Sequence, residues 1–141
     1  MRNDKSTTSV IRNKILERME EEKSPAYITS DFKEYGNPSQ VNRCIRALIK
    51  DKKLIRVGVG IYTPTRISSY SGKEIPIYSV LDIAISALKK LGVEAEYGEP
   101  YRRLFSGEST QVPMIPIVNV KNSKTNRKIK LGRGEVVYER N

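Results

Sequence analysis

The sequence contains no histidine and no tryptophan, one cysteine and only two phenylalanines among its 141 residues. Without histidine, neither a Ser-His-Asp nor a Cys-His catalytic arrangement can form, and His- or Cys-rich zinc sites are excluded too. Cys44 cannot form an intramolecular disulfide, so nothing demands an oxidising compartment. The sequence therefore predicts a non-enzymatic protein with no catalytic residue, no metal site and no cofactor.

Long apolar runs are also lacking. Charges interrupt every apolar stretch well short of the roughly 18 residues that a membrane span requires. The first residues contain no apolar run of signal-peptide length. We therefore expect a cytoplasmic protein that does not interact with a membrane.

Positive charge is what the chain has in excess, since 26 Lys and Arg against 16 Asp and Glu give a net charge of +10. Residues 37–66 hold seven basic residues and one acidic residue, and residues 121–133 hold six basic residues and no acidic one. Concentration of charge in two stretches is typical of a surface that binds a polyanion, above all nucleic acid. The alternative interpretation is that these basic stretches only keep the protein soluble.

The spacing of apolar residues predicts a helix over residues 8–22. Its apolar positions are Val10, Ile11, Ile15, Leu16 and Met19. Ser24-Pro25 ends this helix, because a residue before proline avoids the α region, and an extended piece follows. A second, short helix is expected through Phe32 and Tyr35, capped by one of residues 29–31 and ended by Gly36 in a left-handed turn.

Asn37 and Pro38 predict the start of a third helix, with an Asn cap and a proline at the first position. Apolar residues then recur three and four apart up to residue 49, which leaves the opposite face polar and cationic. Residues 54–57 and 61–63 are typical of two strands joined by the turn Gly58-Val59-Gly60. Cys44 is interpreted as a small buried apolar residue.

Helix, short strand, helix, turn, helix and hairpin, in this order, are typical of a winged helix-turn-helix domain. Since its third helix enters the major groove by its N-terminal end, the base-reading candidates are Ser39, Gln40 and Arg43. The candidates for phosphate or wing contacts are Asn42, Arg46, Lys50, Lys52, Lys53, Arg56, Gly58 and Gly60. As alternatives, Gln40 and Asn42 are ordinary solvated residues and the two glycines serve only the tight hairpin.

The second half predicts a small unit with a helix and an antiparallel sheet, so the fold class is α+β. Ser79 caps a helix that Gly92 ends, residues 97–107 are compatible with a short helix, and β-like runs follow at 115–120, 128–131 and 136–138. The predicted domains are a winged helix-turn-helix at 1–66, a Ser/Gly/Pro-rich linker at 67–78 and an α+β domain at 79–141. A possible second basic patch consists of Lys121, Lys124, Arg127, Lys128, Lys130 and Arg133, although any one-sided sheet exposes such residues.

The run YITSDFKEYGNPSQVNRCIRALIKDKKLIRVGVGIYTPT resembles the N-terminal winged helix of the AbiEi-type antitoxins, the DNA-binding partners of type IV toxin–antitoxin systems in bacteria. The resembling features are Asp31-Phe32, Val41 and Leu48, Leu54-Ile55-Arg56 and Gly60-Ile61-Tyr62. The segment STQVP at 109–113, after the helix LDIAISALKKLG, is similar to the segment that follows the corresponding helix in the shorter, regulator-like members of that family. The resemblance implies a regulator that represses its own promoter at inverted repeats, beside a gene for a nucleotidyltransferase-like toxin.

The leading hypothesis is thus a sequence-specific regulator whose partner is double-stranded DNA, with a homodimer as a possible form because half-sites lie about one DNA turn apart. One alternative is a protein-interaction module that neutralises a toxin encoded nearby. Another is an RNA-binding protein that uses the basic C-terminal sheet, although its strands lack the aromatic clusters that stack on bases. An enzyme is the least expected class.

Overall fold

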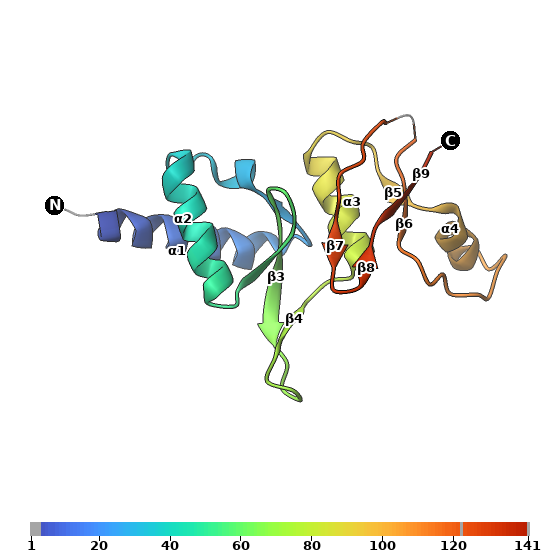
Figure 1. Cartoon of the computed structure of the whole chain (residues 1–141), viewed down its shortest axis with the longest axis horizontal. Coiled ribbons are helices and arrows are strands. Elements are labelled where there is room, and N and C mark those ends of the chain that lie inside the picture. The colour runs from blue at the N-terminus through green and yellow to red at the C-terminus, as the bar shows by residue number, and fades with distance from the viewer. Residues whose placement is uncertain (1–3, 122, 141) are drawn as a thin grey trace. The chain divides into compact units, whose positions relative to one another are not determined.

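The computed structural model describes residues 4–121 and 123–140, and over these residues the chain has the expected α+β class (Figure 1). Contacts divide the chain into two compact units. The first unit consists of Met1–Arg56 and Gly60–Ile77, and the second of Val57–Val59 and Tyr78–Asn141.

The first helix, α1 (Asp4–Glu22), begins earlier than expected and ends at the predicted residue. Ile11 and Ile15 are fully buried, four residues apart on one face of the helix. Val10 is half exposed, so its assignment to this apolar face was wrong. Adjacent helical residues point about 100° apart, and the narrow buried stripe of α1 leaves Val10 outside it.

The second expected helix is instead a single 3-10 turn, η1 (Thr29–Phe32), preceded by strand β1 (Tyr27–Ile28). A carboxylate oxygen of Asp31 fixes the start of the turn by accepting a 2.9 Å hydrogen bond from the Ile28 N–H. Gly36 is not one of the left-handed residues, contrary to expectation. A Cβ at Gly36 would lie 2.6 Å from Ile11 Cδ1, so a larger residue there would require the Ile11 side chain to shift.

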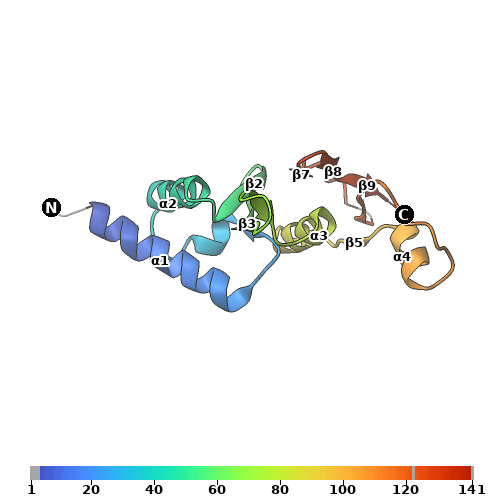
Figure 2. The same ribbon diagram turned by 90° about the horizontal axis from the view of Figure 1, so that it is seen from below.

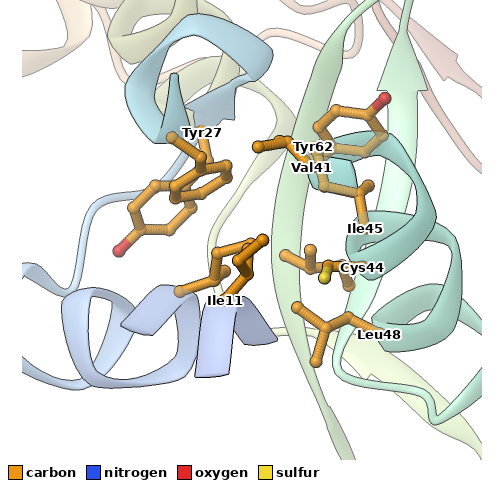
Figure 3. Close-up of a cluster of buried hydrophobic side chains, with 10 residues drawn as sticks. Ile11, Tyr27, Val41, Cys44, Ile45, Leu48 and Tyr62 are labelled. Atoms are coloured by element: carbon orange, nitrogen blue, oxygen red, sulfur yellow. The ribbon is translucent and has the colours of Figure 1, made fainter. Parts of the chain in front are cut away.

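Helix α2 (Pro38–Lys50) begins as predicted, with Asn37 as its cap and Pro38 at its first position. Its buried face carries the apolar residues that the spacing indicated. Together with α1, β1 and η1, this face builds the core of the first unit (Figures 2 and 3). The core residues are Ile11, Ile15, Tyr27, Phe32, Val41, Cys44, Ile45, Leu48, Leu54 and Tyr62.

The expected hairpin is formed by β2 (Leu54–Gly58) and β3 (Ile61–Ile67), in a sheet ordered β1-β3-β2. Strand β3 continues past the predicted end and pairs antiparallel with β4 (Glu74–Pro76), with Thr65 opposite Pro76 and Ile67 opposite Glu74. Residues 67–78, expected as a linker, therefore form much of a second hairpin. We call the hairpin over residues 65–76 the arm.

The second unit contains the predicted helices and short strands. Its elements are α3 (Val80–Lys90), β5 (Glu96–Tyr97), α4 (Glu99–Phe105), β6 (Ile117–Asn119), β7 (Lys130–Leu131), β8 (Gly134–Glu135) and β9 (Val137–Glu139). The Ser79 side chain caps α3 by accepting from the Asp82 N–H at 3.2 Å, and Gly92 ends the helix with a φ of 84°, both as predicted.

The sheet of the second unit is mixed, whereas an antiparallel sheet was expected. In the order β5-β6-β9, β5 and β6 are antiparallel but β6 and β9 are parallel. Strands β7 and β8 form a separate antiparallel pair, and the chain between β6 and β9 is long enough to permit a parallel return.

Candidate nucleic-acid interface

The outer side of α2 exposes five polar or cationic residues, which we call the cationic face. They are Ser39, Asn42, Arg43, Arg46 and Lys50. Four of these residues, at steps of four, three and four, form one stripe along the helix. The buried core residues of α2 fix this orientation, because the helix cannot rotate without exposing them.

Gln40 lies at the start of α2 but has a structural task. Its side-chain oxygen accepts a 3.0 Å hydrogen bond from the Asn37 N–H, and the Asn37 side chain accepts a 2.9 Å bond from the Gln40 N–H. This reciprocal arrangement is a capping box. The carboxamide of Gln40 is thereby held at the helix start, while Ser39 and Arg43 remain exposed.

The cationic face continues into the turn after α2, where Lys52 and Lys53 are exposed. The Lys52 N–H donates to the Ile49 carbonyl at 3.1 Å, and the Lys53 N–H donates to the Leu48 carbonyl at 2.9 Å. This is a Schellman motif, in which a left-handed residue, usually glycine, follows the helix. Here that residue is Lys52, with a φ of 61°.

Helices α3 and α4 end in the same motif with glycine at the corresponding position. Gly92 has a φ of 84° and Gly107 a φ of 85°. The Val93 N–H donates to Leu88 at 2.9 Å, and the Glu108 N–H donates to Arg103 at 2.9 Å. Lysine is not confined to the end of α2, because α1 is also followed by a left-handed lysine, Lys23, with a φ of 51°.

Ion pairs do not neutralise the cations at this surface. Across residues 4–121 and 123–140, no acidic side chain lies within 4.0 Å of the charged groups of Arg43, Arg46, Lys50, Lys52 or Lys53. The one nearby carboxylate along the chain, Asp51, lies 3.9 Å from Arg12 instead. These charges are solvated and available to an external anion.

The tip of the β2–β3 hairpin is also exposed. Gly60 has a φ of 70°, a left-handed conformation that favours glycine, and its carbonyl accepts a 3.2 Å bond from the Thr29 N–H. Val59, at the tip, is 76% exposed, and Arg56 on β2 is exposed as well. Gly58 is the last residue of β2. Gly60 thus meets a need of the turn.

Cys44 lies on the opposite side of α2 from the cationic face and is completely buried. Its Sγ donates to the Thr8 carbonyl at 3.4 Å. Burial raises the pKa of the Cys44 thiol, although Arg12 and Arg43 act in the opposite direction. The interpretation of Cys44 as a core residue is confirmed.

The second basic patch lies entirely in the second unit. Lys128 and Lys130 are exposed and flank the fully buried Ile129, as alternation predicts. Lys121 is paired with Glu94 at 3.8 Å. Lys124, Arg127 and Arg133 are exposed. The Tyr138 hydroxyl donates to the Arg127 carbonyl at 2.6 Å, and the Arg140 guanidinium donates to the Ser123 carbonyl at 2.8 Å, so backbone contacts hold this segment.

Sequence reasoning missed the arm as a candidate surface. Arg66 and Lys73 are exposed on it, and Tyr70 at its tip is 100% exposed. Two signals were available in the sequence. The extended pattern of residues 64–67 was interpreted as the end of a strand and the start of a linker, and the Ser-Gly-Lys turn before Glu74 was interpreted as part of that linker.

The second unit has a surface pocket of about 630 Å³ beside α4, lined in part by Arg103, Met114, Ile117 and Glu139.

No helix in the described part of the chain is both long and apolar enough to cross a membrane. Over the same residues, no three His, Cys, Asp or Glu side chains cluster as a metal site would require.

The model of a protein family described as "Family of unknown function (DUF6088)" matches residues 11–141. No curated protein and no solved structure matches the chain.

Proposed function

We propose that this chain, which belongs to the family of unknown function DUF6088, is a double-stranded DNA-binding transcription regulator. The residues of its first unit support this proposal. The cationic face of α2 is the observation that carries this proposal. Five cations in and after α2 have no acidic partner among the described residues. A polyanion is the partner that such a surface fits best.

The order of elements supports a winged helix-turn-helix use of this unit. Helix α1, strand β1, the turn η1, helix α2 and the β2–β3 hairpin follow one another as in that architecture. In this interpretation α2 enters the major groove by its N-terminal half. Ser39 and Arg43 then reach base edges, and arginine suits guanine because it donates two parallel hydrogen bonds to O6 and N7.

Residues towards the end of α2 would bind the DNA backbone. Arg46, Lys50, Lys52 and Lys53 follow Arg43 along the cationic face and the subsequent turn. Lys52 and Lys53 place two further charges directly after the helix, and no acidic side chain among the described residues pairs with them.

The proposed biological role is repression of the protein's own promoter, as the resemblance to AbiEi-type antitoxins suggests. A mobility-shift experiment tests it, with the DNA upstream of the gene compared with scrambled duplex of equal length. Preferential binding that persists at about 150 mM salt is expected, since non-specific contacts weaken steeply with salt. Equal binding to both duplexes, lost together as salt rises, would contradict sequence-specific regulation.

Two substitutions separate base reading from phosphate contact. We expect Arg43→Ala to lower affinity for the specific site by about 1–3 kcal/mol, with little effect on scrambled DNA. Lys53→Ala should weaken both duplexes alike and reduce the slope of log affinity against log salt by about 1. Identical, salt-insensitive losses from both substitutions would refute this assignment of roles.

A protein-binding role for the second unit is a second candidate, favoured by its exposed apolar residues. Val112, Met114 and Ile115 are exposed, Met114 by 96%, and all three line the pocket beside α4. Such a surface is typical of an interaction site. Co-expression with the product of an adjacent toxin gene would relieve growth arrest, and Met114→Glu would remove the relief, if this unit neutralises a toxin.

A further inference from the structure

The loop at the end of the arm is ordered by its own hydrogen bonds. The Ser68 N–H donates to the Lys73 carbonyl at 2.8 Å, and the Gly72 N–H donates to the Ser68 carbonyl at 2.9 Å. The Ser68 hydroxyl accepts from the N–H groups of Tyr70 and Ser71 at 3.2 and 3.3 Å. Gly72, with a φ of 71°, permits the turn. This loop holds Tyr70 completely exposed, so no core contact accounts for the aromatic ring.

The two faces of the arm differ in charge. In the antiparallel register Arg66 is opposite Ile75, Ile67 is opposite Glu74, and the next pair towards the tip is Ser68 with Lys73. Since residues two apart share a face, Arg66 and Lys73 lie on the same face. Glu74 lies on the other face, where the Thr65 hydroxyl donates to its carboxylate at 2.6 Å.

The cationic side of the arm is therefore unneutralised. Neither Arg66 nor Lys73 has an ion-pair partner within the residues that the structure describes. An exposed tyrosine between two unpaired cations combines an apolar ring for sugars or base edges with charges for phosphates.

The base of the arm is attached to the end of the cationic face. The Thr65 N–H donates to the Lys53 carbonyl at 3.1 Å, and the Thr65 hydroxyl lies 3.1 Å from the Lys52 carbonyl. From Thr65 to Ser68 the strand extends about 10 Å, at ~3.3 Å per residue, and the loop that carries Tyr70 lies beyond it. An arm that starts beside Lys52 and Lys53 therefore reaches past the end of the cationic face.

We propose that the arm is a second DNA-binding element, which contacts the duplex flanking the segment bound by α2. Arg66 and Lys73 bind phosphates, and the Tyr70 ring packs against sugar or base edges in the neighbouring groove. This inference rests on the proposed DNA-binding function and extends the binding site beyond the reach of α2.

The test is hydroxyl-radical footprinting on the upstream DNA, together with affinity measured over a range of salt. The variants are Tyr70→Ser and the double variant Arg66→Gln/Lys73→Gln, both confined to exposed side chains. The matched control, Lys14→Gln/Lys89→Gln, removes two exposed cations elsewhere. Arg43→Ala identifies the DNA segment whose protection depends on α2.

Both arm variants should keep the central protected segment and lose protection on its flank. The double variant should lower the salt slope by about 2, corresponding to two phosphate contacts, and the control should leave the slope unchanged. Tyr70→Ser should weaken binding about fivefold or more without changing the slope, since stacking contacts carry no counterion release.

Failure of this inference and failure of the proposed function give different results. If Arg43→Ala weakens specific binding while both arm variants keep the wild-type footprint and slope, the arm does not bind DNA and the proposed function stands. If the wild-type protein protects no segment preferentially, both proposals fall. An effect of Tyr70→Ser on single-stranded DNA alone would also overturn the proposed duplex contact.

Discussion

At Lys52 the backbone conformation favours glycine, whereas the proposed phosphate contact requires a positive charge. Its φ of 61° lies in the left-handed region, which costs a non-glycine residue about 1–2 kcal/mol. We expect Lys52→Gly to raise the free energy of unfolding by about 1 kcal/mol, after allowing for the greater entropy of glycine in the unfolded chain. The same substitution should lower the salt slope of DNA binding by about 1, because a phosphate contact is lost.

Denaturant unfolding and salt-dependent binding measure these two opposite effects. Lys53→Gly is the matched control, because Lys53 is not among the left-handed residues. It should reduce both stability and salt slope. If Lys52→Gly instead destabilises the protein as Lys53→Gly does, the conformational cost assigned to Lys52 is wrong.

Tyr97 provides a pH-dependent prediction in the second unit. Its hydroxyl donates a hydrogen bond to the Asp82 carboxylate, which with burial raises the pKa of Tyr97 to about 12. The unfolded chain has a tyrosine pKa near ~10, so the folded state holds this proton more tightly. The resulting stability is complete below pH ~10 and is lost as pH rises from about 10 to 12.

Tyr97→Phe should therefore lower stability at pH 8 and flatten the loss between about pH 10 and 12. Urea unfolding at a series of pH values measures both effects. Tyr70→Phe is the control, since Tyr70 lies in the first unit and its side chain is fully exposed. A wild-type pH profile retained by Tyr97→Phe would contradict the role given to the Asp82 hydrogen bond.

Among the elements, α2 depends on its cap for the stability of its first turn. Asn37 and Gln40 exchange hydrogen bonds at the helix start. Asn37→Ala should destabilise the protein by about 1 kcal/mol, whereas Asn37→Ser should largely retain stability because serine also caps helices. Thermal unfolding checks this pair, and equal stability of the two variants would show that the cap contributes little.

The elements that the sequence predicted are those with local signals at their ends. Asn37-Pro38 marked the start of α2, and Ser79 and Gly92 marked the ends of α3. The short η1 was predicted as a longer helix, because its cap residues and the spacing of Phe32 and Tyr35 fit one helical face as well as a single turn. Gly36 was assigned to a left-handed turn, but the close approach of Ile11 is a tertiary fact that local pattern does not contain.

For the candidate surface too, the sequence predicted some features, and others became evident only in the structure. Helical spacing was enough to predict that Arg43 and Arg46 face outward, because their neighbours on the other side are apolar. It could not show that Gln40 is held by Asn37, that Lys52 is left-handed, or that Arg66 and Lys73 share a face. Each of these depends on hydrogen bonding or strand register, and the Ser/Gly composition of residues 68–72 fits a hairpin loop and a linker equally well.

At the scale of the whole molecule, the division into two units predicts where the chain can be cut. All ten core residues of the first unit lie between Ile11 and Tyr62. Beyond them, β4 completes the sheet by pairing with β3, and the Ile77 N–H donates to the Pro64 carbonyl at 3.4 Å. A fragment ending at residue 77 retains these interactions, whereas one ending at residue 66, the boundary predicted from the sequence, removes them.

We therefore expect residues 1–77 to unfold cooperatively and residues 1–66 to be less stable by about 2 kcal/mol. The difference reflects several strand hydrogen bonds worth ~0.5–1.5 kcal/mol each, including that between Thr65 and Glu74. Thermal and urea unfolding of both fragments measures it. Equal stability would mean that β4 is dispensable and that residues 67–78 behave as the linker their composition suggested. Absence of a cooperative transition in residues 1–77 would show that the first unit does not fold independently.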